Sequence, residues 1–445
     1  MSKNHYKLSL FNRRSPILWG AIALALTLGA CGETTPSADS DATDTADTAD
    51  TTTSGEGLKI GTLLPITGDL AQYGGPMQDS ATLLVETVNS CGGVLGQPVQ
   101  LISEDDQTDP AAGAAAMSKL AEVDQVSGVV GAAASSVSSA AVDIAVRNQV
   151  VEISPSATSP VFTEQAKAGD FDGYWFRTAP PDTFQGQALA QLAMDQGYET
   201  VAVMGINNDY GSGLVQSFTD AYTALGGTVV NQDNPTLYPP DASSFDSEVS
   251  SVFNGSPDAV LLVAYPETGS LILQAAFEQG FLGGDTQVLL TDGMKDASIA
   301  ELVGKDSDGS FVISGVMGTA PSAGGPGLEQ FTAVYNDAFN RDPSVFDPNT
   351  WDATALIALA AEAAGDTSGT AIRDAIRSVA NAPGTEVTDV CEALELVRQG
   401  EEINYQGASG PVDLDEQGDV VGSYDIWTVG DDGAIQVQET IEISG

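Results

Sequence analysis

Histidine and basic residues are scarce in this chain of 445 residues. Lys and Arg number 15 against 62 Asp and Glu, which gives a formal net charge of −47 at pH 7. Such a charge repels nucleic acid and anionic membrane surfaces, so no nucleic-acid partner is expected. The one histidine, His5, lies near the N-terminus, which argues against histidine-dependent catalysis and most zinc sites in the rest of the chain. Because a Gly-rich phosphate loop and a Ser/His/Asp set are also missing, we expect no enzyme activity, no cofactor and no metal.

A hydrophobic run long enough to cross a membrane is missing too. The most apolar segment, residues 17–30, is shorter than the about 20 residues that a spanning helix needs. It follows a basic stretch and ends in small residues before a cysteine, an order typical of a signal peptide over residues 1–30. Leu28-Gly29-Ala30-Cys31 resembles the lipobox of bacterial lipoproteins, which implies that the thiol of Cys31 carries a lipid. The alternative is an ordinary signal peptide with an incidental cysteine.

The next segment, residues 31–56, consists mostly of Thr, Asp, Ala and Ser and shows no apolar periodicity. Such a composition cannot bury enough apolar surface to fold, which predicts a disordered acidic tether. A flexible tether of about 25 residues has a root-mean-square span of roughly 25–30 Å. We therefore expect an exported protein, in the periplasm or at the outer face of the cytoplasmic membrane, anchored there by the lipid on Cys31.

After the tether, short apolar runs alternate with helical patterns. LKIGTLLP, VQLIS, SGVVG and VVEIS are typical of buried strands, and helical patterns separate them. This β-α-β order predicts a parallel sheet with helices on both faces. The same pattern restarts after RTAPPD at 177–182, with TVAVMGI, DAVLLVAY and TQVLLT as strands. Since about 390 residues are too many for one core, we expect two α/β lobes.

The pattern of residues in the last third of the chain predicts that the chain returns to the first lobe. VISGVMGTAPS is an apolar run that suits a crossing between lobes, residues 328–398 are rich in helical patterns, and two strand-like runs close the chain. The predicted fold is α/β, with two doubly wound parallel-sheet lobes joined by a three-segment hinge. Lobe one comprises residues 57–179 and 317–420, and lobe two comprises residues 180–316 and 421–445. Clefts between such lobes are where ligands bind.

A series of motifs in this order is similar to that of one known family. It runs through LAQYGGPMQ, GAAASSVSSA, SPSATSP, NNDYGSG, AYPETG, LTDG and GASGPVDLDEQGD. Each motif is weak alone, but together they extend from Leu58 to the C-terminus. The chain resembles the leucine/isoleucine/valine-binding (branched-chain amino acid) family of type I periplasmic solute-binding proteins of ABC transporters. The resemblance implies the type I periplasmic binding protein fold and a free amino acid as ligand.

The residues at these motifs suit a zwitterion, which needs an anion site, a cation site and a neutral wall. Ser135 follows SGVVG near the expected start of a helix, where free N–H groups and hydroxyls bind carboxylates. The resemblance assigns the ligand carboxylate to Ser135. It assigns further carboxylate and ammonium contacts to Ser156, Ala157 and Thr158. The alternative for these side chains is ordinary loop and helix-capping chemistry.

An acidic residue and three tyrosines complete the expected site. Asp292, in LTDG at the end of a predicted strand, matches the family position that pairs with the ligand's ammonium group. Tyr73, Tyr210 and Tyr265 match positions that form the wall of the pocket, where an aromatic face shields an aliphatic side chain. The alternatives are a solvated surface aspartate, in a chain with 62 acidic residues, and tyrosines of the core or the surface.

The cysteines depart from the family pattern. Branched-chain binders of this family carry a disulfide near the anion site, but the matching positions here are Thr108 and Ala134. Besides Cys31, the chain holds Cys91 and Cys391. Two cysteines in an oxidising compartment suggest a bridge, which would join distant parts of lobe one. The alternative is two separate buried thiols.

The function implied by the resemblance is that of an extracytoplasmic substrate-binding lipoprotein of an amino acid ABC importer. The protein would clamp a free amino acid, branched-chain or neutral, between its lobes and deliver it to the permease subunits. The alternative is a ligand sensor of the same fold that signals to a membrane receptor. The identity of the ligand is open at this level among branched-chain, small neutral and aromatic amino acids and short-chain amides.

Overall fold

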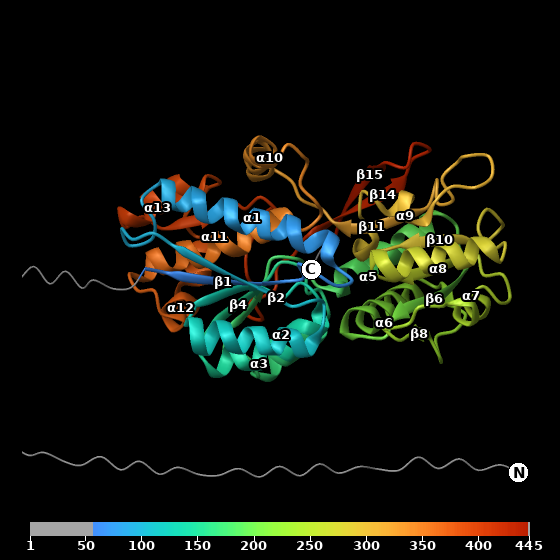
Figure 1. Cartoon of the computed structure of the whole chain (residues 1–445), viewed down its shortest axis with the longest axis horizontal. Helices are drawn as coiled ribbons and strands as arrows, with labels where there is room; N and C mark the ends of the chain where they lie inside the picture. The colour runs from blue at the N-terminus through green and yellow to red at the C-terminus, as the bar shows by residue number, and fades with distance from the viewer. Residues whose placement is uncertain (1–56, 444–445) are drawn as a thin grey trace, which may run out of the picture. The chain divides into compact units, whose positions relative to one another are not determined.

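The computed structural model describes residues 57–443. The expected signal peptide, the tether and Cys31 lie outside these described residues. Within residues 57–443, no helix combines the length and the apolar character that a membrane crossing requires. The described residues form two α/β lobes, each built around its own main sheet (Figure 1).

Lobe one is built on a five-stranded parallel sheet in the order β2-β1-β3-β4-β5. The GVVG sequence of β3 is buried at every residue, which is typical of a strand in a sheet covered on both faces. Figure 1 shows α1 on one side of this sheet and α2 and α3 on the other. The elements are β1 (Lys59–Leu64), α1 (Ala71–Ser90), β2 (Gln100–Asp105), α2 (Pro110–Ser118), the π-helix η1 (Lys119–Asp124), β3 (Gly128–Gly131), α3 (Ser135–Arg147), β4 (Val151–Ser154), α4 (Val161–Ala168) and β5 (Trp175–Arg177).

Lobe two contains an eight-stranded sheet in the order β15-β14-β11-β10-β9-β6-β7, with β8 also paired to β6. β14 runs antiparallel to β11 and to β15, and the other pairs are parallel. The first part of the lobe comprises α5 (Asp182–Asp195), β6 (Thr200–Ile206), α6 (Asp209–Ala224), β7 (Thr228–Val229), β8 (Thr236–Tyr238), α7 (Asp246–Val252), β9 (Ala259–Val263), α8 (Pro266–Glu278), β10 (Gln287–Leu290), the 3₁₀ helix η2 (Asp292–Met294), α9 (Ile299–Val303) and β11 (Met317–Pro321).

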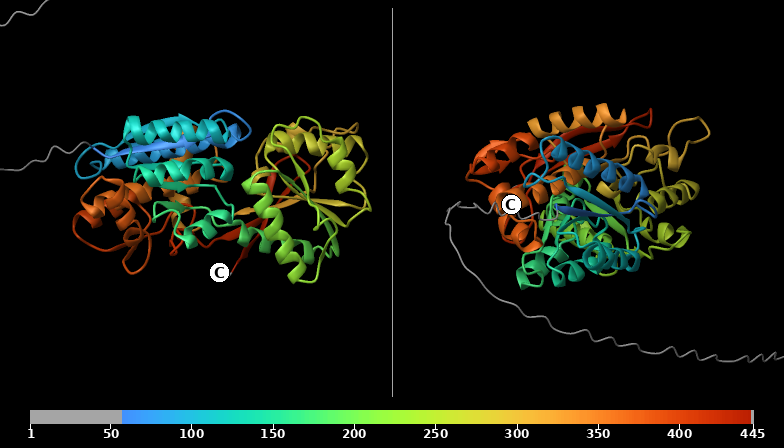
Figure 2. Two further views of the ribbon diagram at one scale, coloured as in Figure 1. Left: turned by 90° about the horizontal axis from the view of Figure 1, so that it is seen from below. Right: turned by 60° about the vertical axis from the view of Figure 1, so that its left-hand side comes forward.

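The chain then returns to lobe one and leaves it again. Figure 2 (left) shows the late orange helices beside the blue N-terminal elements. Helix α11 is buried along most of its length and belongs to the same apolar core as β1 and α1. The returning elements are α10 (Pro326–Phe339), α11 (Asp347–Ala364), α12 (Gly369–Ala380), β12 (Thr385–Val387), α13 (Val390–Arg398) and β13 (Ile403–Tyr405), and the chain ends in lobe two with β14 (Ser423–Val429) and β15 (Ile435–Glu442).

The expected boundary at residue 317 needs a correction. Strand β11, Met317–Pro321, pairs with β10 and β14 and therefore belongs to lobe two. The apolar run suits a crossing by its sequence, but its backbone is part of the second sheet, and the chain leaves this sheet only after Pro321. The two-lobed α/β fold with three connecting segments is confirmed.

Buried polar contacts hold the connecting segments together. The guanidinium of Arg177, at the end of β5, donates from Nε to Asp419 at 2.6 Å, and neither side chain is more than 5% exposed. The hydroxyl of Tyr424, at the start of β14, donates to the carbonyls of Pro180 and Pro181 at 3.4 and 3.2 Å. The first and third connections between the lobes are thus bonded to one another.

Cys91 and Cys391 form a disulfide with a Cα–Cα distance of 5.7 Å. Cys91 is the residue after α1, and Cys391 lies in the first turn of α13, so the bond joins segments 300 residues apart in lobe one. This is the pair that the sequence predicts.

Candidate ligand-binding site

Most of the expected site residues follow the carboxyl ends of parallel strands, where α/β folds bind their ligands. Ser135 and Ser156 lie after β3 and β4 of lobe one, and Tyr265 and Asp292 lie after β9 and β10 of lobe two. Between them is a small cavity. The cavity is lined by residues of both lobes: Leu70, Tyr73, Met77, Ala133, Ala134, Ser135, Ser156, Tyr210, Tyr265, Asp292, Gly293 and Phe346.

The lobe-one side of the cavity offers hydrogen-bond donors to an anion. Ala134 occupies the N-cap position of α3, so no side chain caps the helix and its first N–H groups remain for a ligand. The Ser135 hydroxyl accepts from the N–H of Ser159 at 3.2 Å and keeps its own proton to donate. The Ser156 hydroxyl donates to the carbonyl of Ala133 at 3.1 Å. A carboxylate at this helix N-terminus would also be favoured by the helix dipole.

Ala157 and Thr158 do not line the cavity, which differs from the sequence-based expectation. The N–H of Ala157 donates to the Ser154 hydroxyl at 2.8 Å, and its carbonyl accepts from Arg177 at 3.0 Å. The carbonyl of Thr158 accepts from the N–H of Asp182 at 2.8 Å. The buried guanidinium of Arg177 needs carbonyl acceptors, and this need orients the loop so that both residues lie behind the cavity wall.

The lobe-two side of the cavity carries a buried acid. Asp292 is 3% exposed, and its carboxylate accepts from the Tyr210 hydroxyl at 2.8 Å. Burial raises the pKa of Asp292, and the hydrogen bond from Tyr210 opposes this effect. The side chains that line the cavity include no cation. A ligand with a positive charge would therefore supply what this carboxylate lacks.

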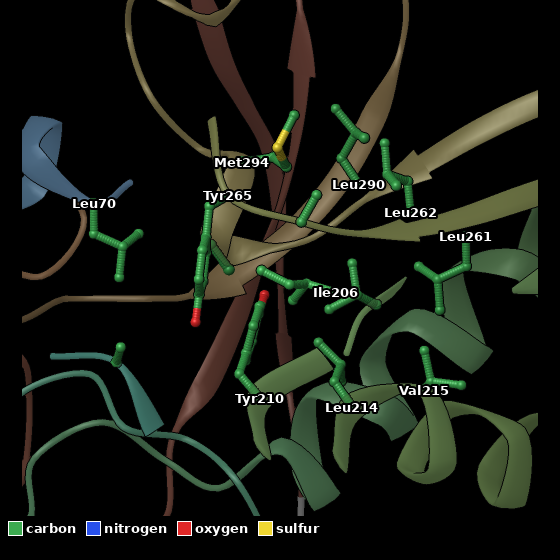
Figure 3. Close-up of a cluster of buried hydrophobic side chains, with 14 of the residues drawn as sticks. Leu70, Ile206, Tyr210, Leu214, Val215, Leu261, Leu262, Tyr265, Leu290 and Met294 are labelled. Atoms are coloured by element: carbon green, nitrogen blue, oxygen red, sulfur yellow. The ribbon is translucent and has the colours of Figure 1, made fainter. Parts of the chain in front are cut away.

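Aromatic rings form the wall between the two polar ends. Tyr210 and Tyr265 stack with their ring centres 5.6 Å apart, and Figure 3 shows Leu70 of lobe one facing them across the site. The Tyr73 hydroxyl crosses between the lobes and donates to the carbonyl of Gly293 at 3.3 Å. Its ring meets that of Phe346 edge to face at 6.2 Å. This wall suits the apolar part of a small ligand.

Leu70, Met77 and Phe346 line the cavity but were missed in the sequence. Met77 follows Tyr73 by four residues on α1, so helical spacing could have placed it on the same face. Leu70 directly precedes that helix. Phe346 lies in a loop before α11, far along the chain from the other lobe-one residues, and no periodicity marks it.

Among residues 57–443, no group of three or more His, Cys, Asp or Glu side chains is arranged to hold a metal ion.

A family model described as periplasmic binding protein matches residues 57–420. This chain belongs to that family. The leucine/isoleucine/valine-binding resemblance and the type I periplasmic binding protein fold are both confirmed by this match and by the similar proteins. The protein is thus an extracytoplasmic solute-binding protein by family membership.

Three similar proteins illustrate the range of the family. The chain is 29% identical over 317 residues to Leu/Ile/Val-binding protein homolog 1 of Brucella abortus, which covers 69% of this chain and 78% of that protein. It is 28% identical over 398 residues to the chemotactic signal transduction system substrate-binding protein BasB of Halobacterium salinarum. This match covers 87% of this chain and 91% of that protein. The fold is similar to the crystal structure of the leucine binding protein LivK from Thermotoga maritima, with a TM-score of 0.72 and 25% sequence identity. This match covers 86% of this chain and 99% of that chain.

Proposed function

We propose that this periplasmic binding protein is the extracytoplasmic substrate-binding lipoprotein of an amino acid ABC importer. The observation that carries the proposal is one cavity with opposite polar ends, the uncapped N-terminus of α3 with Ser135 on lobe one and Asp292 on lobe two. A free amino acid has a carboxylate for the first end and an ammonium group for the second. Closing the lobes around it would bury both charges in complementary surroundings.

The wall of the cavity favours an aliphatic side chain on that amino acid. Leu70, Met77 and Phe346 are apolar, and the tyrosine rings add further apolar surface. The names of the Brucella and Thermotoga relatives refer to leucine, isoleucine and valine. We propose a branched-chain amino acid as the ligand of this protein.

A thermal-shift screen of the twenty amino acids tests this function. A ligand at a hundredfold excess over its Kd stabilises the folded protein by about 2.7 kcal/mol, so leucine, isoleucine or valine should raise the Tm by several degrees. Two controls remove one charge each, 4-methylpentanoate without the ammonium group and isoamylamine without the carboxylate. Both should bind more weakly than leucine. If no amino acid shifts the Tm, the proposed function is wrong.

The lipid anchor on Cys31 is part of the proposal and rests on the lipobox resemblance. Cys31→Ser should move the protein from the membrane fraction to the soluble fraction of the exported material, with amino acid affinity unchanged, because residue 31 lies outside the matched family region. Fractionation after a salt wash measures this. A substituted protein that stays with the membranes would exclude the anchor.

A second candidate function is that of a sensor that passes ligand binding to a membrane receptor. The name of the Halobacterium relative, a chemotactic signal transduction system substrate-binding protein, favours it. Deletion of the gene in the native host separates the two. Loss of leucine uptake with intact taxis supports the importer, and loss of taxis with intact uptake supports the sensor.

A further inference from the structure

Gly213, in the second turn of α6, lies against lobe one. A Cβ atom at this position would be 2.8 Å from Cδ of Pro160 and 3.1 Å from Oγ of Ser159, both on the loop before α4. Carbon atoms in contact are normally about 3.5–4.0 Å apart. Helix α6 of lobe two also contacts α3 of lobe one. A side chain at position 213 would therefore overlap lobe one as the lobes stand in this structure.

The two glycines of the NNDYGSG motif have different surroundings. A Cβ on Gly211 would overlap the carbonyl oxygen of Ile206, which belongs to the same lobe, so a side chain there would disrupt lobe two in any position of the lobes. Outside its own helix, the three atoms nearest to a Cβ on Gly213 all belong to lobe one. A side chain at position 213 would therefore obstruct only the arrangement in which the lobes are together.

On the lobe-two side, helix α6 connects this contact to the ligand site. Tyr210 precedes Gly213 by three residues, a spacing that places two residues on the same face of a helix. Tyr210 lines the cavity beside Tyr265 and donates to Asp292 at 2.8 Å (Figure 3). The distance between α6 and lobe one therefore also sets how closely these residues approach a ligand held on lobe one.

On the lobe-one side, the contacted loop is held in place. Ser159 is 2% exposed, its N–H donates to the hydroxyl of Ser135 at 3.2 Å, and its carbonyl accepts from Arg177 at 3.0 Å. The ring of Pro160 is rigid and cannot turn away as a long side chain could. Relief of an overlap at this loop therefore requires the lobes to move apart.

We propose that Gly213 is a positioning residue for lobe closure, because its missing side chain lets α6 approach the loop of Ser159 and Pro160 so that both ends of the cavity reach the ligand together. This inference rests on the proposed function, because it assumes an amino acid that draws the lobes together. Gly213 does not line the cavity. A side chain there raises the free energy of the closed state and leaves the open state and the ligand contacts unchanged.

Gly213→Ala should weaken leucine and valine by the same factor, at least about fivefold, because the apparent Kd of each rises as the fraction of molecules able to close falls. The ratio of the two Kd values should stay within about twofold of that of the wild type. Titration calorimetry with both amino acids measures these affinities. A loss of specific ligand contacts would instead change the ratio.

The stability of the ligand-free protein separates closure from a structural role. Alanine is favoured over glycine inside a helix, so Gly213→Ala should leave the ligand-free Tm equal to that of the wild type or higher. Differential scanning calorimetry measures this.

Pro160→Ala removes the two ring atoms that a Cβ at position 213 would meet. Alone it should leave the leucine affinity within about twofold of the wild type. Combined with Gly213→Ala it should bring the leucine affinity back to within about threefold of the wild type, because the overlap is relieved from the other lobe.

The matched control is Gly186→Ala, which makes the same change in α5 of the same lobe. Its Cβ would lie 2.6 Å from the carbonyl carbon of Ser217 and 2.8 Å from the backbone nitrogen of Phe218, so the overlap is inside lobe two. This variant should lower the ligand-free Tm, and Pro160→Ala should not reverse its effect.

Three results would overturn the proposal. The first is leucine binding by Gly213→Ala within about twofold of the wild type. The second is a ligand-free Tm lower than that of the wild type, as for Gly186→Ala, and the third is a loss of affinity that Pro160→Ala does not relieve. A wild type that binds no amino acid overturns the proposed function itself, and this inference with it.

Discussion

At the scale of single residues, the cavity separates two kinds of polar contact. Ser135 and the first N–H groups of α3 are neutral donors, whereas Asp292 is a buried acceptor held by the Tyr210 hydroxyl at 2.8 Å. Truncation of one partner of a buried charged hydrogen bond costs about 2–5 kcal/mol, because the remaining charge stays buried. Substitutions at the two ends should therefore affect different ligand groups.

Asp292→Asn should weaken leucine binding by at least about 30-fold, because asparagine keeps the size but removes the charge that pairs with the ammonium group. 4-Methylpentanoate should bind the variant as well as it binds the wild type. Ser135→Ala is the complementary variant, and it should weaken both carboxylate ligands but not isoamylamine. Calorimetry on the three proteins measures these affinities. Leucine binding by Asp292→Asn within about threefold of the wild type would contradict the assignment of Asp292.

Another single residue should make stability depend on pH. Burial raises the pKa of Asp106 to about 7, against a usual value of 3.8, and a hydrogen bond from the N–H of Thr108 only partly opposes this. The folded protein therefore binds a proton that the unfolded chain lacks between about pH 4 and 7. The stabilisation that this proton provides is complete below about pH 4 and is lost as the pH rises through 7.

Asp106→Asn cannot ionise, so it should be more stable than the wild type at pH 8, by about 1–4 kcal/mol, with the difference vanishing near pH 4. Urea unfolding at both pH values measures this. Asp105→Asn is the control of opposite sign. Burial tends to raise the pKa of Asp105, but hydrogen bonds from Thr67 and Gln107 outweigh this and lower it. That variant should lose stability at pH 8. A gain for Asp106→Asn that is equal at pH 4 and 8 would contradict the ionisation argument.

At the scale of elements, lobe one depends on contacts between segments far apart in the chain. Helix α11 fills the core beside α1, and the disulfide joins the end of α1 to α13 across 300 residues. In the unfolded chain this bond closes a long loop, and closing long loops removes much conformational entropy from the unfolded state. The bond should therefore matter for stability and not for the cavity, which neither cysteine lines.

Replacement of both Cys91 and Cys391 by serine should destabilise the protein by about 2–5 kcal/mol and leave the leucine affinity within about twofold of the wild type. Differential scanning calorimetry and titration calorimetry measure the two effects. A thiol assay on the unfolded, unreduced Cys31→Ser protein should detect no free thiol. Two free thiols in that assay would mean that the bridge does not form.

At the scale of the whole molecule, three connecting segments join the lobes, and hinge closure around a ligand is typical of such an arrangement. The cavity contains side chains from both lobes, and the Tyr73 hydrogen bond to Gly293 is one of the contacts that cross between them. Ligand entry requires such contacts to open, and a zwitterion bound to both lobes would stabilise the closed state.

Leucine should therefore lower the radius of gyration measured by small-angle X-ray scattering, and 4-methylpentanoate should do so less, because it lacks the charge that engages lobe two. The measurement is best made at about 1 M salt, where the Debye length of about 3 Å screens repulsion within a chain of net charge −47. Identical scattering curves with and without a saturating concentration of leucine would contradict a clamp.

Much of the fold and part of the site depend on local patterns that the sequence shows directly. Alternating buried strands and helices predict two α/β lobes, because burial on both faces requires continuous apolar runs such as GVVG. Ser135 and Asp292 could be placed at the cavity because each follows a parallel strand of its own lobe, and α/β folds bind ligands beyond the carboxyl ends of such strands. Tyr73, Tyr210 and Tyr265 were assigned from the family motifs, and all three line the cavity. Tyr73 and Tyr210 lie in the first turns of α1 and α6, and Tyr265 lies at the N-cap of α8.

Other features of the site and of the lobe boundary are decided by tertiary packing alone. The loop with Ala157 is turned by a buried arginine, the run at 317–321 pairs with a sheet that the chain then leaves, and Phe346 reaches the cavity from a distant loop. Local patterns specify which groups a segment offers. Which of those groups remain unsatisfied depends on neighbours hundreds of residues away, and unsatisfied groups are what a ligand binds.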